Sequence, residues 1–373
     1  MVIHNGNIFN GQRFIKYKNI KIIDDKIVSI SNDKMTDAIY IDAKEAYVVP
    51  GFIDIHTHGI NGYDVNHIET KNQYKQCFFY YAKNGTTSLL PSTVAQEEIY
   101  TNNLLNYAIS SYCNKSVVGI HLEAPYINAS KLGAQNKDFI RKPSVNDFEN
   151  HYNKYYGVIK RVTIAPELDE KFALSKFLYK KNILPSFGHT ICDSQRGQLA
   201  FNNGYILATH FMNAMPQIHH REVSITGKAL IDDNVFIELI GDLKHVSSDI
   251  IRMVYKIKPR DKIILISDSM SATLLGDGEY FLSGKKVIVK NNTARLIEGN
   301  LAGSLITMLD GVKNFVKIGI DLEGALQFAT YNPAKILNLE DEIGAIKEGN
   351  YADILLLDNK LNIKKVILKG QVI

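Results

Sequence analysis

Six side chains that can bind a metal ion stand at or just after the ends of short apolar segments. They are His56, His58, Glu123, His189, His210 and Asp268. Imidazole nitrogens and carboxylate oxygens are the ligands that Zn²⁺ and similar cations accept in proteins. Alone, a single histidine such as His210 is more often a packed or hydrogen-bonded residue than a ligand. Burying six such groups together without a cation would cost several kcal/mol, so the pattern predicts a metal site.

Neighbouring residues refine this prediction. Alternate residues of an extended strand point to the same face, so His56 and His58 can hold one ion between them. His121 lies two residues before Glu123 and shares its face, and we expect it to support the site or to pack in the core. Glu167 ends another apolar segment and is interpreted as structural support. Three further histidines have polar or turn-like surroundings and are not candidates: His4, His67 and His151.

The candidate ligands meet in space if their segments are the parallel strands of a (β/α)8 barrel. From Pro50 onward, short apolar segments alternate with longer amphipathic stretches, which is typical of an α/β fold. In a TIM-type barrel the carboxyl ends of all strands lie on one face, where the active site is found. The predicted strands span residues 52–56, 86–91, 117–123, 161–166, 184–189, 205–210, 235–241 and 263–268.

The amphipathic stretches predict helices outside the barrel. The clearest span residues 71–84, 97–110, 169–181, 193–202 and 246–258. After Asp268 comes a turn-rich stretch, and then a predicted hairpin around residues 285–296. Helices are expected at residues 305–318 and 322–337.

Both ends of the chain are rich in strand signals. Residues 2–9, 19–23, 26–30 and 46–49 are strand-like, and residues 352–357 and 365–368 are similar. We therefore expect a small β-sandwich domain assembled from residues 1–50 and 338–373, with the catalytic barrel at residues 51–337. The fold class is α/β.

Composition limits the functional classes. The 373 residues are 45% hydrophobic, enough for a large core, and the net charge is only +4 with both signs interspersed. This argues against a nucleic-acid partner. No apolar run approaches the ~20 residues of a membrane span, and the amino terminus does not resemble a signal peptide. Cys77, Cys113 and Cys192 have no paired spacing, so we expect a cytoplasmic protein without a membrane partner.

The segment PGFIDIHTHG at residues 50–59 resembles the first-strand signature of the amidohydrolase superfamily. The order His-x-His, Glu, His, His and Asp is similar to that of the N-acetylglucosamine-6-phosphate deacetylases within it. The resemblance spans nearly the whole chain, and ATHFMNAM at residues 208–215 is its most specific part. Other segments that carry it are residues 121–123, 188–190, 220–222, 268–270, 277–280, 301–304, 332–334 and 344–353.

The resemblance implies a metal-dependent enzyme that hydrolyses the acetamide of N-acetylglucosamine 6-phosphate in amino-sugar catabolism and recycling. Glu123, His189 and His210 match the ligands of the shared metal site, and His56 and His58 match the pair found in members that hold a second ion. One or two divalent ions per chain are implied. Zn²⁺ is the first choice, and Fe²⁺, Mn²⁺ and Co²⁺ are the alternatives.

The resemblance also implies roles in catalysis and substrate binding. Asp268 matches the catalytic aspartate, which would take a proton from a metal-activated water and return it to the leaving amine. His245 matches a histidine near the scissile amide. The backbone N–H groups of Asn213 and Ala214 match those that bind the phosphate. Arg221 matches an arginine that reaches the phosphate from the other subunit of a homodimer.

Two positions depart from the family pattern. Ala124 stands where the family usually has glycine, and its methyl group beside a ligand bears on the number and preference of metal ions. Gln135, a candidate substrate-binding residue, stands where some members have histidine. Its amide can still hydrogen-bond a sugar hydroxyl or carbonyl, but it carries no positive charge.

Other functions stay open. Many cyclic amidases bridge two metals with a modified lysine at the end of strand four, but residues 163–167 read TIAPE. Glu123, on strand three, is the obvious replacement. A deaminase would share the histidines without needing the phosphate-binding segment. A non-catalytic scaffold relative would be expected to lose ligands, whereas all ligand positions and Asp268 are occupied here.

Overall fold

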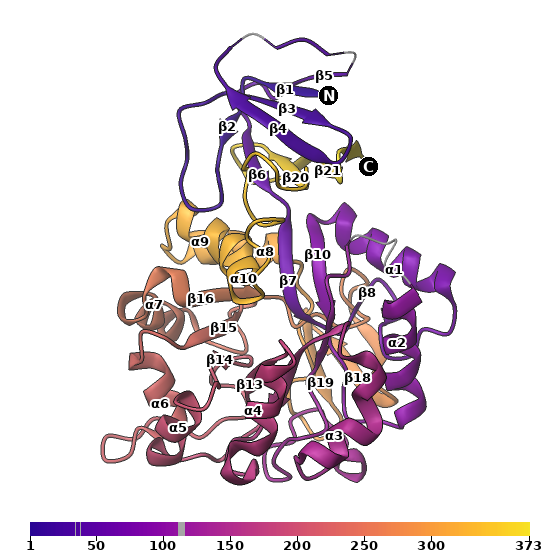
Figure 1. Cartoon of the computed structure of the whole chain (residues 1–373), viewed down its shortest axis with the longest axis vertical. Helices are drawn as coiled ribbons and strands as arrows, with labels where there is room; N and C mark the ends of the chain where they lie inside the picture. Colours follow the sequence, from indigo (N-terminus) through magenta and orange to yellow (C-terminus); the bar gives the residue numbers. More distant parts are fainter. Residues whose placement is uncertain (34, 38, 111–115) are drawn as a thin grey trace.

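The computed structural model describes residues 1–33, 35–37, 39–110 and 116–373, so Cys113 lies outside the described residues. Figure 1 shows two parts along the long axis: a β-rich part that holds both termini, and a larger part of helices around strands. Cys77 and Cys192 are buried and free. Within the described ranges, none of the helices combines the length and the apolar character that crossing a membrane requires.

A curled parallel sheet forms the centre of the larger part. β7 (Phe52–Thr57) pairs with β10 (Thr86–Pro91), and six further strands pair in chain order. The predicted strands are confirmed, although several end earlier than predicted because the backbone leaves the extended conformation there. The six are β11 (Ile120–Leu122), β12 (Ile159–Ile164), β13 (Leu184–Phe187), β14 (Leu207–Ala208), β15 (Phe236–Ile240) and β16 (Ile263–Ile266).

Backbone contacts link the two groups of strands at both edges. Between β10 and β11, Ser92 forms an isolated parallel bridge with His121. On the other side, Asp268 N donates to His56 O at 3.0 Å and so joins the end of β16 to β7. The strand ends that carry the predicted ligands are therefore neighbours around the curl.

Helices follow most of these strands and cover the outside of the sheet (Figure 1). Residues with good capping side chains mark where helices begin. Thr70 forms a capping box with Gln73, and the Asp193 side chain accepts from Arg196 N at 2.7 Å. The helices are α1 (Lys71–Lys83), α2 (Glu98–Ser110), α3 (Val145–Tyr152), α4 (Ala173–Lys180), α5 (Ser194–Phe201), α6 (Ser224–Ile231), α7 (Ser248–Ile257), α8 (Met308–Lys317), α9 (Leu322–Ala329) and α10 (Tyr331–Ile336).

The prediction of a single helix at residues 322–337 is wrong, because the structure has two helices there. The segment is divided into α9 and α10 at Thr330, whose φ and ψ are −131° and −77°. Pro333 explains the division, because proline lacks an N–H and its ring collides with the carbonyl four residues earlier. Neither α3 nor α6 was predicted. Most residues of α6 are buried on all sides, which hides the one-sided apolar pattern of a surface helix.

The predicted hairpin at residues 285–296 is confirmed as β18 (Lys285–Lys290) and β19 (Thr293–Leu296). A third antiparallel strand, β17 (Gly278–Leu282), pairs with β18 in the stretch that was predicted only as turn-rich. A short pair, β8 (Gly59–Ile60) and β9 (Tyr63–Asp64), follows β7.

Two sheets make up the β-rich part. One has the order β4-β3-β1-β5 and the other the order β2-β6-β20-β21-β22, in which β6 and β20 pair antiparallel. Both ends of the chain therefore build one sheet. The strand predicted at residues 2–9 is interrupted, because Asn5 has a φ of 55°. The strands are β1 (Val2–His4), β2 (Asn7–Ile8), β3 (Asn19–Ile23), β4 (Lys26–Ser31), β5 (Tyr40–Asp42), β6 (Tyr47–Pro50), β20 (Ile354–Leu357), β21 (Ile363–Leu368) and β22 (Gln371–Val372).

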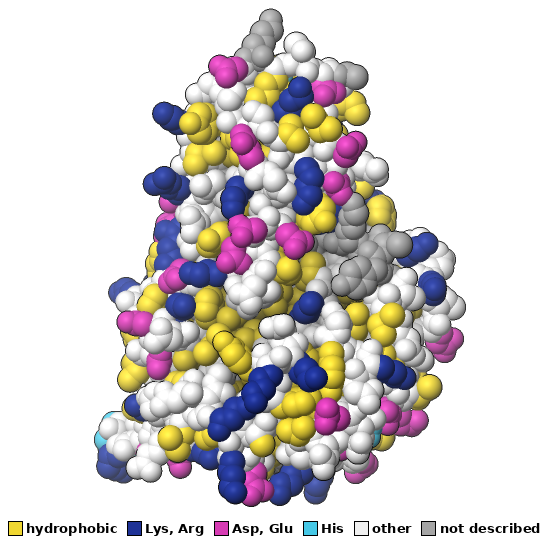
Figure 2. Space-filling model, in the orientation of Figure 1, with side chains coloured by type: hydrophobic (Ala, Val, Ile, Leu, Met, Phe, Trp, Pro, Cys, Tyr) yellow, Lys and Arg dark blue, Asp and Glu magenta, His cyan; other side chains and the backbone are white. Residues whose placement is uncertain are grey.

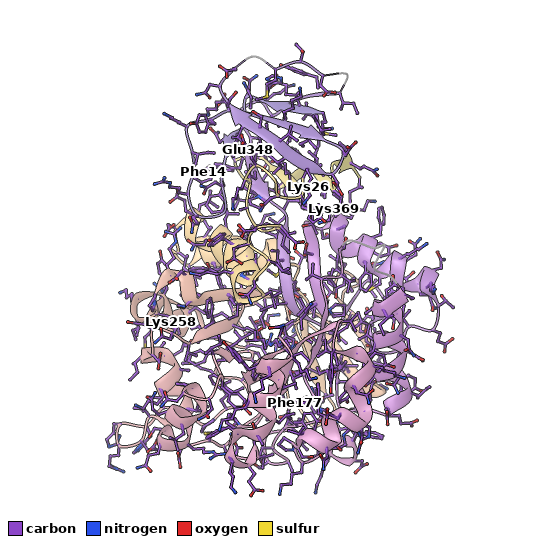
Figure 3. All side chains as sticks on the ribbon, in the orientation of Figure 1. Phe14, Lys26, Phe177, Lys258, Glu348 and Lys369 are labelled. Carbon is purple, nitrogen blue, oxygen red and sulfur yellow. The ribbon has the colours of Figure 1, made fainter. Side chains whose placement is uncertain are left out.

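Several residues labelled in Figure 3 make contacts that tie the terminal segments to the rest of the chain. Phe14 N donates to Glu323 Oε1 of α9 at 2.8 Å, which ties the amino-terminal segment to a helix of the larger part. The ammonium groups of Lys26 and Lys369 lie 3.3 and 3.9 Å from the centre of the Tyr351 ring. The face in Figure 2 shows Lys and Arg side chains interspersed with Asp and Glu, and hydrophobic side chains near the middle.

Candidate metal centre

The five predicted ligands and the predicted catalytic Asp268 meet at the carboxyl ends of the strands. Glu123 is central: its Oε1 lies 3.2 Å from His189 Nε2 and 3.1 Å from His210 Nε2. His58 Nε2 lies 3.5 Å from Glu123 Oε2 and 3.3 Å from Asp268 Oδ1. Two sets result, each with its ligand atoms within 4.8 Å of one another: His56 with His58 and Asp268, and Glu123 with His189 and His210. All six side chains are buried.

Three of these residues have an unusual backbone. His189, His210 and Asp268 have φ values of 46°, 30° and 49°. Positive φ is uncommon for residues other than glycine and is found where surrounding structure enforces it, often at functional sites. The left-handed turn at each strand end directs these side chains toward the common centre instead of along the strand.

Hydrogen bonds fix a proton on Nδ1 of two imidazoles. Nδ1 of His58 lies 3.1 Å from Ser92 O, and Nδ1 of His189 lies 2.6 Å from Lys131 O. Because a carbonyl only accepts, each Nδ1 carries the proton and each Nε2 of the neutral ring faces the centre as a lone pair. His56 Nε2 is buried without a hydrogen-bond partner among the described residues. Inward lone pairs around a carboxylate, one of them unpaired, suit a bound divalent cation.

The carboxylates of the centre are ionised at neutral pH. Burial opposes ionisation of Glu123, but His56, His189 and His210 outweigh it and hold its pKa well below its usual range. Burial likewise opposes ionisation of Asp268, but the neighbouring His58 and His56 outweigh it and lower its pKa. Both groups are thus available as anionic ligands or proton acceptors.

A buried ion pair lies beneath the centre and was not predicted. Arg161 Nη1 donates to Glu238 Oε1, and Glu238 Oε2 lies 3.2 Å from His56 Nδ1. Although burial disfavours its charge, Arg161 and His56 lower the pKa of Glu238 to about 2. The signal in the sequence was a charged residue within each of two apolar strands, which costs free energy unless the two charges pair.

A cavity of about 520 Å³ opens onto this centre. His245 lines it, and its Nδ1 lies 2.7 Å from Asp242 Oδ2. Asn213, Ala214 and Gln135 line it as well, so these predicted site residues lie beside the predicted ligands. Arg221 is different: it is exposed on a turn, with Nη1 2.7 Å from His220 Nε2, and is not part of the lining.

Two predicted substrate-binding groups already have partners in the chain. Gln135 Nε2 donates to Glu123 Oε2 at 2.7 Å, and its Oε1 accepts from Ala95 N at 2.6 Å. Gln135 therefore holds a candidate metal ligand. Asn213 N donates to His210 O at 3.0 Å, so a phosphate oxygen at this N–H would have to share or replace that bond.

The supporting residues behave as predicted. His121 bonds Ser92 Oγ and Thr163 Oγ1 through its two nitrogens, at 2.9 and 2.8 Å, and directs neither toward the centre. Glu167 accepts from Asn128 Nδ2 and Ile191 N, both at 2.9 Å, and so joins two loops. The other histidines have local partners away from the centre: His4 with Asn19, His67 with Asp64 and His151 with Asp147.

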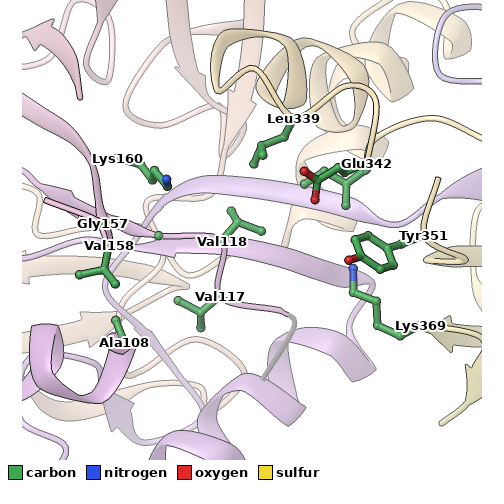
Figure 4. A pocket seen from close by; sticks show the side chains of 12 residues that line it. Ala108, Val117, Val118, Gly157, Val158, Lys160, Leu339, Glu342, Tyr351 and Lys369 are labelled. Carbon is green, nitrogen blue, oxygen red and sulfur yellow. The ribbon is translucent and has the colours of Figure 1, made fainter. Parts of the chain in front are cut away.

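A second cavity, of about 440 Å³, lies near the amino ends of β11 and β12 (Figure 4). Val117, Val118 and Val158 contribute apolar walls, and Lys160 and Lys369 approach from opposite sides. None of the predicted ligands is among the described residues that line it. Among the described residues, both candidate ligand sets therefore lie at the first cavity and not at the second.

The chain belongs to the amidohydrolase family, whose model matches residues 47–373. Among curated proteins, the N-acetylglucosamine-6-phosphate deacetylase of Bacillus subtilis is 32% identical over 370 residues, covering 96% of this chain and 93% of that protein.

Solved structures agree with this relationship. The N-acetylglucosamine-6-phosphate deacetylase of Thermotoga maritima has a TM-score of 0.89 and 32% identity, covering 100% of this chain and 99% of the other. An aspartate-to-alanine variant of the Mycobacterium smegmatis enzyme, solved with N-acetyl-D-glucosamine-6-phosphate, has a TM-score of 0.93 and 26% identity, covering 100% and 98%.

Proposed function

We propose that this protein is an enzyme that hydrolyses the acetamide of N-acetyl-D-glucosamine 6-phosphate to D-glucosamine 6-phosphate and acetate, within amino-sugar metabolism. The observation that carries the proposal is the pair of ligand sets around Glu123, with Asp268 and His245 beside the same cavity. The names of the relatives support the substrate, and the extent of the similarity supports the reaction class.

The residues of the centre fit a divalent cation. Glu123, His189 and His210 would hold one ion, and His56 and His58 would contribute to a second. Zn²⁺ suits this nitrogen-rich set best, and Fe²⁺, Mn²⁺ or Co²⁺ are alternatives. When bound, such an ion polarises an amide carbonyl and lowers the pKa of a coordinated water from ~16 toward ~7.

Asp268 is the proposed general base and acid. Its lowered pKa keeps the carboxylate ionised, so it can accept a proton from the attacking water. The same carboxyl then returns that proton to the nitrogen of the departing glucosamine. The buried setting keeps bulk water from competing for the proton during this transfer.

His245 is the proposed hydrogen-bond donor to the acetamide oxygen. Burial works against its protonation, but the bond to Asp242 outweighs burial and raises its pKa. In the protonated ring, Nδ1 donates to Asp242 while Nε2–H remains for the substrate. A donor held in this way stabilises the negative charge that develops on oxygen in the transition state.

The sugar phosphate would lie against the part of the cavity lining formed by Asn213 and Ala214. The backbone at Asn213 and Ala214 offers N–H groups, and Lys131 Nζ lies 3.3 Å from the nearby Met215 O and adds positive charge. Binding the phosphate holds the acetamide at the centre and contributes energy remote from the reacting bond.

We propose further that the chain forms a homodimer in which Arg221 reaches the phosphate in the partner's cavity. Arg221 is exposed and does not line the cavity of its own chain, which supports a role in the other chain. The guanidinium is suited to phosphate because it donates in pairs and stays charged. Large apolar side chains near α5 and α6 are exposed and favour a covered face here: Ile191, Leu199, Ile218 and Ile231.

The parallel strands are proposed to close into a (β/α)8 barrel over residues 51–337, with residues 1–50 and 338–373 as a β-sandwich domain. The contacts at both edges of the sheet support closure, and the pairing of β6 with β20 supports a domain from both ends.

Acetate release from N-acetylglucosamine 6-phosphate by the purified, metal-loaded protein tests the function. Unphosphorylated N-acetylglucosamine is the control, and much lower activity is expected with it. A cyclic amide substrate and an aminopurine test the cyclic amidase and deaminase alternatives. Absence of acetate release, or hydrolysis of one of the alternative substrates instead, would overturn the proposal.

A further inference from the structure

The Arg161–Glu238 pair crosses the interior of the curled sheet, from β12 to β15. Both side chains are completely buried, and Arg161 Nη1 donates to Glu238 Oε1. Breaking a buried ion pair leaves an uncompensated charge, whereas apolar residues of similar size would pack there without that risk. A contribution to stability therefore does not explain why an ion pair occupies this position.

The remaining donors of Arg161 hold it in one orientation. Nε donates to Ser186 Oγ at 2.9 Å, and Nη2 donates to Thr209 Oγ1 at 2.8 Å. Nη1 also lies 3.4 Å from Ile55 O of β7. Residues of β7, β13 and β15, together with Thr209 just after β14, thus fix the guanidinium, and Glu238 is fixed in turn.

The second oxygen of Glu238 contacts both ligand sets. Oε2 lies 3.2 Å from His56 Nδ1, and it accepts from the backbone N–H of His210 at 2.9 Å. His56 belongs to one candidate set and His210 to the other. As a carboxylate, Glu238 can only accept from His56 Nδ1. In the neutral ring, His56 Nε2 is then a lone pair, 3.4 Å from Glu123 Oε1.

We propose that Glu238, held by Arg161, is a positioning residue that couples the two ligand sets by fixing the proton and orientation of the His56 ring and the backbone of His210. This inference rests on the metal centre of the proposed function but not on its substrate. Glu238 touches no reacting atom. It acts by presenting His56 Nε2 to the ion, as carboxylates do for other metal-binding histidines.

The test is metal binding by the full-length Glu238→Gln protein. A glutamine can donate to His56 Nδ1, so the ring proton can move to Nε2 and block ligation. Competition between Zn²⁺ and a chromophoric chelator should show affinity about 10–100-fold weaker. The visible spectrum of the Co²⁺-loaded variant should differ from that of the parent. In a His56→Ala background, the same substitution should lose most of its effect.

Asp353→Asn is the matched control, because Asp353 and Lys369 form a buried ion pair, with Oδ2 and Nζ 2.6 Å apart, away from the centre. It should leave the metal affinity and the Co²⁺ spectrum unchanged. If Glu238→Gln does not fold, the double variant Arg161→Gln with Glu238→Gln removes both charges and serves in its place. Weak metal binding by the folded double variant supports positioning by Glu238.

Unchanged metal affinity and an unchanged Co²⁺ spectrum in the folded variants would overturn the inference, since the pair would then be purely structural. An equal effect of Glu238→Gln with and without His56 would overturn it as well. These measurements use Zn²⁺ and Co²⁺ without any substrate, so they do not depend on the proposed reaction. A protein that binds metal in a Glu238-dependent way but releases no acetate would instead refute the proposed function.

Discussion

The Nε2 atoms of His189 and His210 lie 3.0 Å apart. The proton of the His189 ring is on Nδ1, where Lys131 O accepts it at 2.6 Å. In the neutral ring the Nε2 of His189 is then a lone pair, and this atom, His210 Nε2 and Glu123 Oε1 surround a position that could hold a cation.

Removing either histidine should empty this position. We expect His189→Ala and His210→Ala to lose most bound metal and most activity, measured by elemental analysis of dialysed protein and by acetate release. His56→Ala should lower the occupancy of a second ion more than that of the first. His151→Ala, which removes a histidine far from the centre, is the control. Full activity of thoroughly demetallated protein would contradict the metal role.

Asp268→Asn keeps the shape of the side chain and removes the proton acceptor. General acid–base assistance typically contributes about 10²–10⁴ in rate. We expect kcat to fall by at least this factor while substrate binding, measured by calorimetry, is largely kept. A variant with near-normal kcat would place the base elsewhere, and Glu167 would then be the next residue to test.

Asp242→Asn should change the pH dependence of kcat/KM. The protonated His245 ring is the form that donates from Nε2, and the bond to Asp242 raises its pKa above the ordinary ~6.5. Activity that needs protonated His245 is present below the raised pKa and is lost as the pH rises through it. Without the Asp242 carboxylate the alkaline limb should move to lower pH. An unmoved limb would show that His245 does not titrate in catalysis.

Arg221→Ala should raise KM for the phosphorylated substrate and change activity toward the unphosphorylated sugar far less. Because the arginine is proposed to act across the dimer, mixing Arg221→Ala and Asp268→Asn chains should restore some activity. One site of the mixed dimer then has an intact Asp268 and receives an intact Arg221. Arg252→Ala, at an exposed arginine of α7, should leave KM unchanged. No recovery under conditions of subunit exchange would refute the shared site.

Much of the site could be predicted because strand ends are visible in the sequence. His56 and His58 follow the alternation of β7, and Glu123, His189, His210 and Asp268 follow apolar segments whose parallel pairing brings them together. The residues that support the ligands were harder to predict from the sequence. Arg161 and Glu238 lie on strands that are not neighbours, so only the curl of the sheet reveals that they pair.

Loop geometry was the other limit. Gln135 reaches Glu123 through a loop whose path has no periodic signal, so its partner could not be predicted. The positive φ of His189, His210 and Asp268 could not be predicted either. None of these residues is glycine, the residue type that signals a positive φ in a sequence. The division between α9 and α10, by contrast, was foreseeable from Pro333 and the known effect of proline within a helix.

The antiparallel pairing of β6 with β20 affects how the chain can fold during synthesis. Residues 47–50 leave the ribosome long before residues 354–357, their partners in the sheet. Until then the edge of β6 exposes backbone groups that another chain could pair with. The strands of the curled parallel sheet, which pair mostly with their successors, can associate as they emerge. β6 must wait for β20, so the sheet that contains both is completed last although its first strand, β2, is among the earliest segments made.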